Sequence, residues 1–317
     1  MRVAGLGERG LLALLAPLGY PQDAPLPPGD DAGGVWLGKR GLLLKTDGFL
    51  YREVALRGMG PFEVGWRAVA ATASDLVVKM GRPLGFTLGL FIPPDYPVEE
   101  VLALVRGAAA AARAHGAVLL GGDTNKGEEV ALTASGYALA QRPLPRAGAP
   151  GDLVYLAGDR WGKTGAAIDA HYRGLEVPEA FREAAFYPRA RLELLALARL
   201  LKGSADSSDG LAETLWQLSE GLGLGVELEA LPLFPEVLAY AKRVAFPEGQ
   251  EEKALSLVLY GGEEFEAVLV VSKENAGRLE TKARRLGLPL FRAGWLTEGG
   301  GVRFKRVEVE RRGYAHF

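Results

Sequence analysis

The sequence predicts an α/β or α+β protein that is built from two domains. Apolar runs too short for helices alternate along most of the chain with longer segments of helical periodicity. A length of 317 residues is enough for two domains, and a segment dense in Pro and Gly, 141–151, divides the chain near its middle. We therefore expect an N-terminal domain over residues 1–140 and a C-terminal domain over residues 141–317.

The elements expected in the N-terminal domain follow from periodicity and from turn residues. Leucines on one face predict an amphipathic helix over residues 5–19, and the Pro-rich segment 21–28 predicts a loop. A proline begins the helical pattern over 61–80, and an Ala-rich helix is expected over 97–115, ending before Gly116. Short apolar runs bounded by turn residues predict strands at 41–47, 85–92, 117–120 and 129–140, the third of them buried.

The C-terminal domain is expected to alternate in the same way. A strand at 152–157 leads into a Gly-rich turn, and a helix begins near Lys163. Further helices are expected at 189–202, 210–222 and 273–286. Further strands are expected at 225–228, 264–271 and 290–295.

The composition excludes several classes of protein. A net charge of −2 gives no sign of a nucleic-acid or anionic-membrane partner. The chain has no cysteine and only three widely separated histidines, so any metal would be bound by oxygen, which favours Mg²⁺ or Mn²⁺. No stretch approaches the length of a membrane span, and we expect a cytoplasmic protein. Few asparagines and many arginines are typical of a thermophile.

Two Gly-rich segments could be taken for nucleotide-binding loops. Residues 157–164 follow a predicted strand and end in Gly-Lys-Thr, like a P-loop, but Ala157 replaces its first glycine and two large side chains would crowd it. A simple turn is the better interpretation. The glycines at 221, 223 and 225 follow a helix and precede a strand, which is the reverse of the dinucleotide-binding order. A nucleophilic serine elbow is absent as well.

Aspartates recur at the ends of apolar runs, each beside Gly, Ser or Thr. Singly, each could cap a helix or sit in a turn. Strands that end in aspartate would gather these carboxylates at one rim of a sheet, where like charges repel by about 4 kcal/mol at roughly 4 Å and an effective dielectric near 20. Because few basic residues adjoin them, we expect divalent cations there, which predicts metal-assisted phosphoryl transfer. The segments are Gly29-Asp30-Asp31, Thr46-Asp47, Ser74-Asp75, Gly122-Asp123 and Asp206-x-x-Asp209.

Eight short motifs have the order and spacing found in thiamine-monophosphate kinases, a family of the aminoimidazole ribonucleotide synthetase-like superfamily. The chain resembles that family from Gly29 to its last residue. The motifs are Gly29-Asp30-Asp31-Ala32, Thr46-Asp47, Ser74-Asp75-Leu76, Gly121-Gly122-Asp123-Thr124, Arg146-x-Gly148-x-Pro150-Gly151-Asp152, Asp206-x-Ser208-Asp209-Gly210-Leu211, Gly261-Gly262-Glu263 and Gly313-Tyr314-x-His316-Phe317.

The resemblance implies a two-domain fold whose N-terminal mixed sheet forms a homodimer and whose C-terminal α/β domain completes the active site. It implies ATP-dependent phosphorylation of thiamine monophosphate to thiamine diphosphate, by direct in-line transfer assisted by several Mg²⁺ ions. No general base is needed, because the accepting phosphate is already ionised. The implied metal ligands are Asp30, Thr46, Asp47, Asp75, Asp123, Asp206 and Asp209. The implied ATP contacts are Gly122, Asp123, Arg146 and Ser208. The implied substrate contacts are Val54, Glu263 and Tyr314.

Some positions depart from the family pattern. Val54 stands near the position of a substrate-contacting histidine, and Glu264 replaces an aspartate. Residues 78–81, Val-Lys-Met-Gly, replace a turn that resembles Ala-Met-Gly-Gly. Because the changes fall mostly on the acceptor side, two alternatives stay open. One is a related ATP-binding enzyme of the superfamily with a different acceptor, and the other is a non-catalytic nucleotide-binding dimer.

Overall fold

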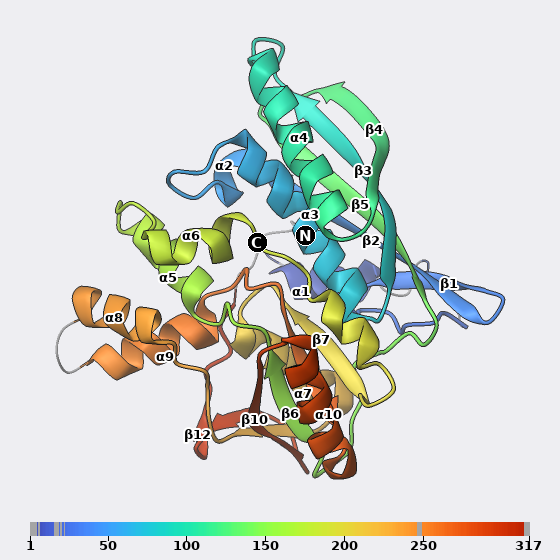
Figure 1. Cartoon of the computed structure of the whole chain (residues 1–317), viewed down its shortest axis with the longest axis vertical. Coiled ribbons are helices and arrows are strands. Elements are labelled where there is room, and N and C mark those ends of the chain that lie inside the picture. Colours follow the sequence, from blue (N-terminus) through green and yellow to red (C-terminus); the bar gives the residue numbers. More distant parts are fainter. Residues whose placement is uncertain are drawn as a thin grey trace.

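The chain folds into two β-sheets with helices packed between and around them (Figure 1). The computed structural model describes residues 5, 7–15, 19, 21, 23–245 and 249–313. The predicted mixed α/β class is confirmed. The helices are α1 (Gly7–Leu15), α2 (Tyr51–Val54), α3 (Pro61–Val78), α4 (Val98–Ala114), α5 (Lys163–Tyr172), α6 (Glu179–Phe186), η3 (Leu192–Ala196, 3₁₀), α7 (Leu211–Leu222), α8 (Pro235–Val244), α9 (Gln250–Tyr260) and α10 (Lys273–Leu286).

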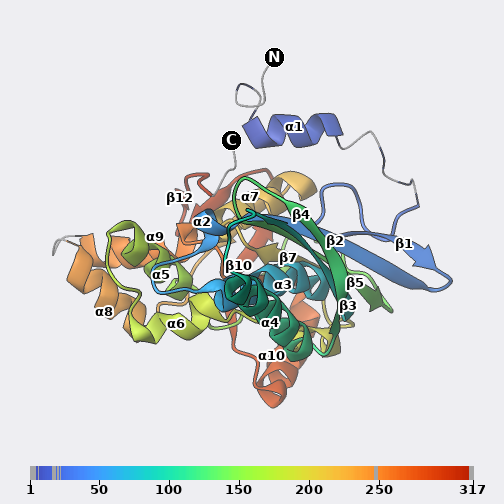
Figure 2. The ribbon, with the colours of Figure 1, turned by 90° about the horizontal axis from the view of Figure 1, so that it is seen from above.

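The N-terminal sheet has the strand order β1-β2-β5-β3-β4. Its pairs are antiparallel except for β3 with β4, which is parallel. Side chains along β5 alternate between buried and half-buried, because one face of the sheet packs against α3 while the other does not. Figure 2 shows α3 and α4 together on that covered side. The strands are β1 (Gly33–Leu37), β2 (Arg40–Leu50), β3 (Arg82–Ile92), β4 (Val118–Lys126) and β5 (Ala131–Ala140).

Two glycines let α3 and α4 pack with their backbones close together. A Cβ atom at Gly65 would lie 1.9 Å from the carbonyl oxygen of Leu104, and one at Gly107 would lie 1.8 Å from that of Phe62. Any side chain at either position would therefore push the helices apart. The close packing holds α3 in place, and α3 carries part of the site described below.

The C-terminal sheet has the strand order β12-β11-β8-β10-β6-β9-β7. Its pairs are antiparallel except for β11 with β8. Strand β9 is buried along its whole length and pairs with β7, which approaches α3 of the N-terminal half. The strands are β6 (Leu153–Ala157), β7 (Gly203–Ser207), β8 (Gly225–Leu228), β9 (Glu266–Val271), β10 (Leu290–Thr297), β11 (Val302–Phe304) and β12 (Val307–Glu308).

The two halves share buried contacts. One hydrophobic cluster contains Leu76 of α3 and also Leu269 of β9. The buried ring of His115, at the end of α4, donates from Nδ1 to the Ala111 carbonyl over 2.7 Å, and its Nε2 accepts the Ala190 N–H over 2.9 Å. Burial lowers the pKa of His115 to about 4, so the ring stays neutral and keeps both hydrogen bonds.

Most predicted elements are present, but the helix expected at 189–202 is wrong. The structure has the 3₁₀ helix η3 and successive turns there, followed by β7. The buried leucines at 194, 197 and 200 recur every third residue, and backbone hydrogen bonds join Leu197 to Leu194 and Leu200 to Leu197. A three-residue repeat matches the 3₁₀ period rather than that of an α-helix.

Several strands also differ from expectation. The strand predicted at 41–47 is the longer β2, and the one at 117–120 is the longer β4. Strand β4 is exposed along nearly all of its length, so the predicted buried strand is wrong. Prediction missed β1, α2, α6, β7, α8, α9, β11 and β12. Within the described residues, no helix is both long and apolar enough to cross a membrane.

Candidate active site

Five carboxylates gather where α3 lies between β2 and β7. Asp30 and Asp31 come from the loop before β1, Asp47 from β2, Asp75 from α3 and Asp206 from β7. Hydrogen bonds and ion pairs through shared partners link them into one group, which we call the acidic cluster. The predicted convergence of these residues is therefore present in the fold.

The route by which they converge differs from the prediction. Asp47 lies inside β2, opposite Ala134 of β5, and the strand continues to Leu50. Asp75 lies inside helix α3, in the last turn before Val78. Of the cluster, Asp206 alone lies next to the last residue of its strand. The carboxylates meet because a helix crosses between two sheets, and not because parallel strands end side by side.

Two cations hold the first pair of carboxylates. The fully buried Lys79 places its Nζ 2.6 Å from Asp30 Oδ1 and 2.9 Å from Asp31 Oδ2. It also donates to the Ser204 carbonyl over 2.5 Å. Arg146 pairs with Asp31 through its guanidinium and donates its backbone N–H to Asp30 Oδ2 over 3.1 Å. Although burial alone would raise it, Lys79 and Arg146 hold the pKa of Asp31 well below its usual value.

A third cation bridges Asp47 and Asp75. Lys45 Nζ lies 2.6 Å from Asp75 Oδ2 and 3.3 Å from Asp47 Oδ1, and Thr72 donates to Asp47 Oδ2 over 2.7 Å. The expectation that basic side chains are scarce here is wrong. Three cations face the five carboxylates. Lys45 comes from β2, Lys79 from the turn after α3, and Arg146 from the Pro- and Gly-rich segment 141–151.

Negative charge is least compensated at Asp75 and Asp206. Burial, together with the nearby charges of Asp47 and Asp31, raises the pKa of Asp75 to about 7 despite Lys45. Burial and the charges of Asp75 and Asp31 raise the pKa of Asp206 well above its usual value. Ser74 donates to Asp206 Oδ1, whereas Oδ2 is buried without any hydrogen-bond partner. An unpartnered, buried carboxylate oxygen needs either a proton or a cation.

The unpartnered Asp206 Oδ2 is the main reason why these residues fit a divalent cation. Within the described residues, no three acidic or histidine side chains are already arranged around a single point as ligands. The donor set is nevertheless all oxygen. Asp47 and Asp75 share a single cation, Lys45, and Asp206 Oδ2 has no partner, so these three carboxylates are only partly compensated. Both oxygens of Asp30, by contrast, already accept hydrogen bonds or ion pairs from protein groups. The cluster therefore fits Mg²⁺ best at Asp47, Asp75 and Asp206.

Other predicted ligands lie away from the cluster. The Thr46 hydroxyl shares a 2.8 Å hydrogen bond with that of Ser135, on the sheet face opposite Asp47. Asp123 lies on the exposed strand β4, three strand positions from β2, or about 14 Å at 4.8 Å per strand. Gly122 has a packing role of its own, since a Cβ there would lie 1.8 Å from the Leu88 carbonyl oxygen.

The predicted residues after β7 lie along one edge of the cluster. Ser208 and Asp209 follow Asp206 closely in the chain, and the Ser208 carbonyl accepts the Glu263 N–H over 2.5 Å. The Glu263 carboxylate pairs with the buried guanidinium of Arg67 on α3. A Cβ at Gly313 would lie 2.9 Å from the Asp209 carbonyl, so the chain returns to this edge just before Tyr314. Tyr314 itself lies outside the described residues.

Val54 is at the end of α2 and packs against the main hydrophobic cluster. Its contacts are those of a core side chain, and its predicted substrate contact stays a prediction.

Sequence reasoning missed several residues of the site. Lys45 stands two residues before Asp47 in a predicted strand, and alternate residues of a strand share a face. This spacing could have predicted that Lys45 lies beside Asp47. In the sequence, Lys79 stands out only as a departure from the family's turn. Met80, which follows it, has a left-handed φ of 65°, a backbone conformation that suits the glycine of the family pattern. Burial raises the pKa of Glu264 to about 8, and its Oε1 has no partner. Nothing local in the sequence predicts that burial.

The segment that resembles a P-loop is occupied by the protein's own carboxylate. The backbone N–H groups of Asp159 and Arg160 each donate to Glu266 Oε1 over 3.1 Å. A Cβ at Gly158 would lie 1.8 Å from Glu266 Oε2, and Lys163 pairs with Glu236 over 2.8 Å. The loop therefore has no room for a phosphate, and its interpretation as a simple turn agrees with the structure.

The two sheets and the acidic cluster between them define a protein of the AIR synthase related class. The family model described as "AIR synthase related protein, N-terminal domain" matches residues 29–140. This segment contains the N-terminal sheet, α3, α4 and four of the five cluster carboxylates.

Comparison along the whole chain identifies the family. The thiamine-monophosphate kinase of Salmonella typhimurium is 30% identical over 298 residues, which cover 88% of this chain and 87% of that protein. The crystal structure of tt0281 from Thermus thermophilus is 68% identical, with a TM-score of 0.93 over 98% of this chain and 100% of that one. The structure "AaThiL complexed with AMPPCP and TMP" is 26% identical, with a TM-score of 0.88 over 100% of this chain and 99% of that one. The chain belongs to the thiamine-monophosphate kinase family.

Proposed function

We propose that this protein transfers the γ-phosphate of ATP to the phosphate of thiamine monophosphate, giving thiamine diphosphate and ADP. Membership of the kinase family supports this activity, as does the likeness to AaThiL in complex with AMPPCP, an ATP analogue, and TMP. The observation that carries the proposal is the buried acidic cluster with its unpartnered Asp206 oxygen. A site that is deficient in positive charge suits the binding of phosphates together with divalent cations.

The chain's own residues would supply position and charge. Asp47, Asp75 and Asp206 would hold Mg²⁺, which lowers the repulsion between donor and acceptor phosphates when bound. Lys79 and Arg146 pair with Asp30 and Asp31 and hold both side chains in place, so that the loop before β1 stays against β7. The proposed ATP contacts remain Gly122, Asp123, Arg146 and Ser208. The proposed substrate contacts remain Val54, Glu263 and Tyr314. Thr46, Asp123 and Asp209 remain proposed metal ligands.

The direct test is ADP release that depends on thiamine monophosphate. We expect purified protein to release ADP from ATP and Mg²⁺ when thiamine monophosphate is present, and to form thiamine diphosphate in equal amount. Thiamine and related pyrimidine phosphates serve as alternative acceptors. ATP binding without turnover on thiamine monophosphate would contradict the proposal and favour a non-catalytic nucleotide-binding protein.

Binding of Mg²⁺ should weaken as the solution becomes acidic. The folded pKa of Asp75, about 7, lies above its ordinary value of 3.8, so the metal-free folded protein takes up a proton as the pH falls through 7. That proton competes with the cation. We expect Mg²⁺ to raise the melting temperature more at about pH 8 than at about pH 6, measured by differential scanning fluorimetry. An Asp75→Asn variant should lose most of this difference, and an equal shift at both pH values would contradict the metal assignment.

We also infer that the protein is a homodimer that pairs through the N-terminal sheet. The face of this sheet opposite α3 exposes large apolar side chains, including Leu44, Val118 and Leu120, each about half exposed. Leu44 is opposite Tyr137 of β5, and a Cβ at Gly85 would lie 2.5 Å from Leu120 and 2.9 Å from the Tyr137 hydroxyl, so these side chains form one surface. An apolar sheet face of this kind suits burial against a second copy.

Replacing Leu120 with Glu should break this dimer. A carboxylate placed in an apolar interface would be desolvated without a partner, so we expect the dimer dissociation constant to rise about 100-fold or more. Analytical ultracentrifugation measures the change. The matched control is Val98→Glu, because Val98 is also exposed but lies on α4. A dimer that survives Leu120→Glu unchanged would place the interface elsewhere.

Four further properties stay proposals. The division into residues 1–140, for nucleotide and metal binding and dimerisation, and 141–317, which completes the site, is supported by the separate sheets. A thermophilic source is supported by 68% identity to a Thermus thermophilus protein. A cytoplasmic location is supported by the use of ATP. We propose no nucleic-acid or membrane partner, since net charge gives no sign of either.

A further inference from the structure

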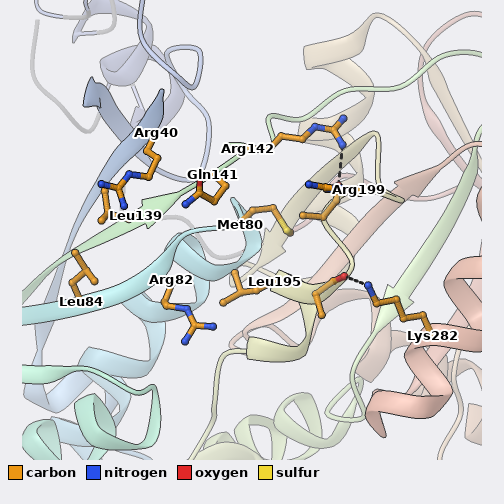
Figure 3. A pocket seen from close by; sticks show the side chains of 12 residues that line it. Arg40, Met80, Arg82, Leu84, Leu139, Gln141, Arg142, Leu195, Arg199 and Lys282 are labelled. Carbon is orange, nitrogen blue, oxygen red and sulfur yellow. Dashed lines mark hydrogen bonds between the residues drawn. The ribbon is translucent and has the colours of Figure 1, made fainter. Parts of the chain in front are cut away.

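A cationic pocket of about 670 Å³ lies between the two sheets, apart from the acidic cluster. Its twelve lining residues include five cations and no carboxylate. Figure 3 shows Arg40 and Arg82 reaching it from the N-terminal sheet, with Arg199 and Lys282 on the opposite side. None of its lining residues belongs to the proposed ATP, metal or thiamine contacts. The cations are Arg40, Arg82, Arg142, Arg199 and Lys282.

The five cations line the same pocket, and no carboxylate among the lining residues compensates their charge. Arg142 donates to the Ala198 carbonyl over 3.0 Å and Lys282 to the Ala196 carbonyl over 2.5 Å, which fixes both side chains but leaves their charge uncompensated. The guanidinium groups of Arg40, Arg82 and Arg199 have no ion pair or hydrogen bond with the described residues. Five cations that line one pocket without a carboxylate repel one another, so the arrangement points to an anion from outside the chain.

The floor of the pocket is apolar. Met80 is buried, and Leu139 and Leu195 are half-buried, so the cations surround a mainly apolar surface. Charge-assisted hydrogen bonds to phosphate are stronger beside such a surface than in open water. The volume exceeds the need of a single phosphate and suits a chain of two or three with an attached organic group.

We propose that this pocket binds a small molecule with two or more linked phosphates, either inorganic polyphosphate or a nucleotide, with Arg82 and Arg199 as its principal contacts. The ligand would connect the N-terminal sheet, through Arg40 and Arg82, to the segment after η3 and to α10 of the C-terminal half. It would also touch Met80, which directly follows Lys79, a cation bound to the acidic cluster. A further contact would be Arg142, which lies in the same segment, 141–151, as Arg146. The site is separate from the one proposed for catalysis.

Calorimetry on the full-length protein in its natural oligomeric state tests this proposal. The protein is kept in EDTA, so that the acidic cluster lacks divalent cations and repels anions. Sodium tripolyphosphate and, separately, ADP are titrated at low and at raised salt. We expect a single site per chain whose affinity falls with salt. Tighter binding of ADP would identify an organic ligand, and tighter binding of tripolyphosphate an inorganic one; both support the site.

Two charge-matched double variants decide where the anion binds. Arg82→Ala with Arg199→Ala should weaken binding about tenfold or more, because two guanidinium contacts are lost. Arg106→Ala with Arg113→Ala, on α4, removes the same charge from exposed positions outside the pocket and should change affinity less than about twofold. The proposal is overturned if the wild type binds neither probe, or if both double variants bind equally well. A partner subunit that fills the pocket would give the first of these results.

Discussion

Replacing Asp206 with Asn should nearly abolish phosphoryl transfer while leaving the metal-free protein at least as stable as the wild type. The amide keeps the shape of the side chain and its place beside Ser74, but it cannot hold Mg²⁺ as a carboxylate does. Loss of a metal ligand removes several kcal/mol of transition-state stabilisation, which corresponds to roughly 10²- to 10³-fold in rate.

Stability should move in the opposite direction because the wild-type carboxylate is costly when it is charged. Burial and the charges of Asp75 and Asp31 raise the pKa of Asp206, and its Oδ2 is unpartnered. A neutral amide removes that repulsion, so the free energy of unfolding should stay the same or rise by about 1 kcal/mol. Turnover is measured as ADP release that requires thiamine monophosphate, and stability as urea unfolding in EDTA.

Asp152→Asn is the matched control. Asp152 is also a buried aspartate, but it pairs with Lys202 over 2.8 Å outside the acidic cluster. Its variant should lose about 1–3 kcal/mol of stability and keep its rate. The metal assignment fails if Asp206→Asn retains a rate within about tenfold of the wild type.

Replacing Lys79 with Met should cause the largest loss of stability at any single position of the site. Its ammonium is fully buried between Asp30 and Asp31 and is bonded to the Ser204 carbonyl. Methionine fits the space but leaves two buried carboxylates with Arg146 as their remaining cation. Removing one partner of a buried ion pair costs about 3–5 kcal/mol. Urea unfolding at neutral pH measures the loss, with Lys39→Met, at an exposed turn, as the control.

The pH dependence of this loss has a definite sign. The wild-type pKa of Asp31 is depressed, so its contribution to stability is present above its ordinary pKa of 3.8 and is lost at lower pH. The variant lacks that contribution at every pH. The gap between the two proteins should therefore persist down to about pH 4 and shrink as the pH falls below that value. Adding Asp31→Asn to Lys79→Met should recover part of the loss at neutral pH. A loss below about 1 kcal/mol at neutral pH would mean that the pair is not needed for folding.

The helices with strong periodicity and clear ends were predictable from the sequence. Helix α10 matches residues 273–286, and α3 begins at Pro61 as expected. The segment 189–202 could not be assigned, because its leucines are compatible with α-helical and with 3₁₀ turns until tertiary burial selects one. The apolar run at 117–120 was expected to be buried, but it lies on an exposed strand, and local hydrophobicity does not distinguish a buried strand from an exposed one.

The acidic residues of the site were visible in the sequence, whereas their neutralising cations were not. Asp30, Asp47, Asp75 and Asp206 stand in recognisable short motifs, and their types alone favour oxygen-bound metal and phosphate chemistry. Lys79 lies between Asp30 and Asp31 because of the path that the chain takes after α3.

The sequence by itself determined the family, the mixed α/β class and the acidic residues of the cluster, because these depend on residue type and on spacing along the chain. The tertiary structure alone decided which charges meet, which carboxylate oxygen stays unpaired, and that arginines from distant segments surround one pocket. Contacts between residues far apart in sequence are set by how two sheets pack around α3, and no local pattern encodes that packing.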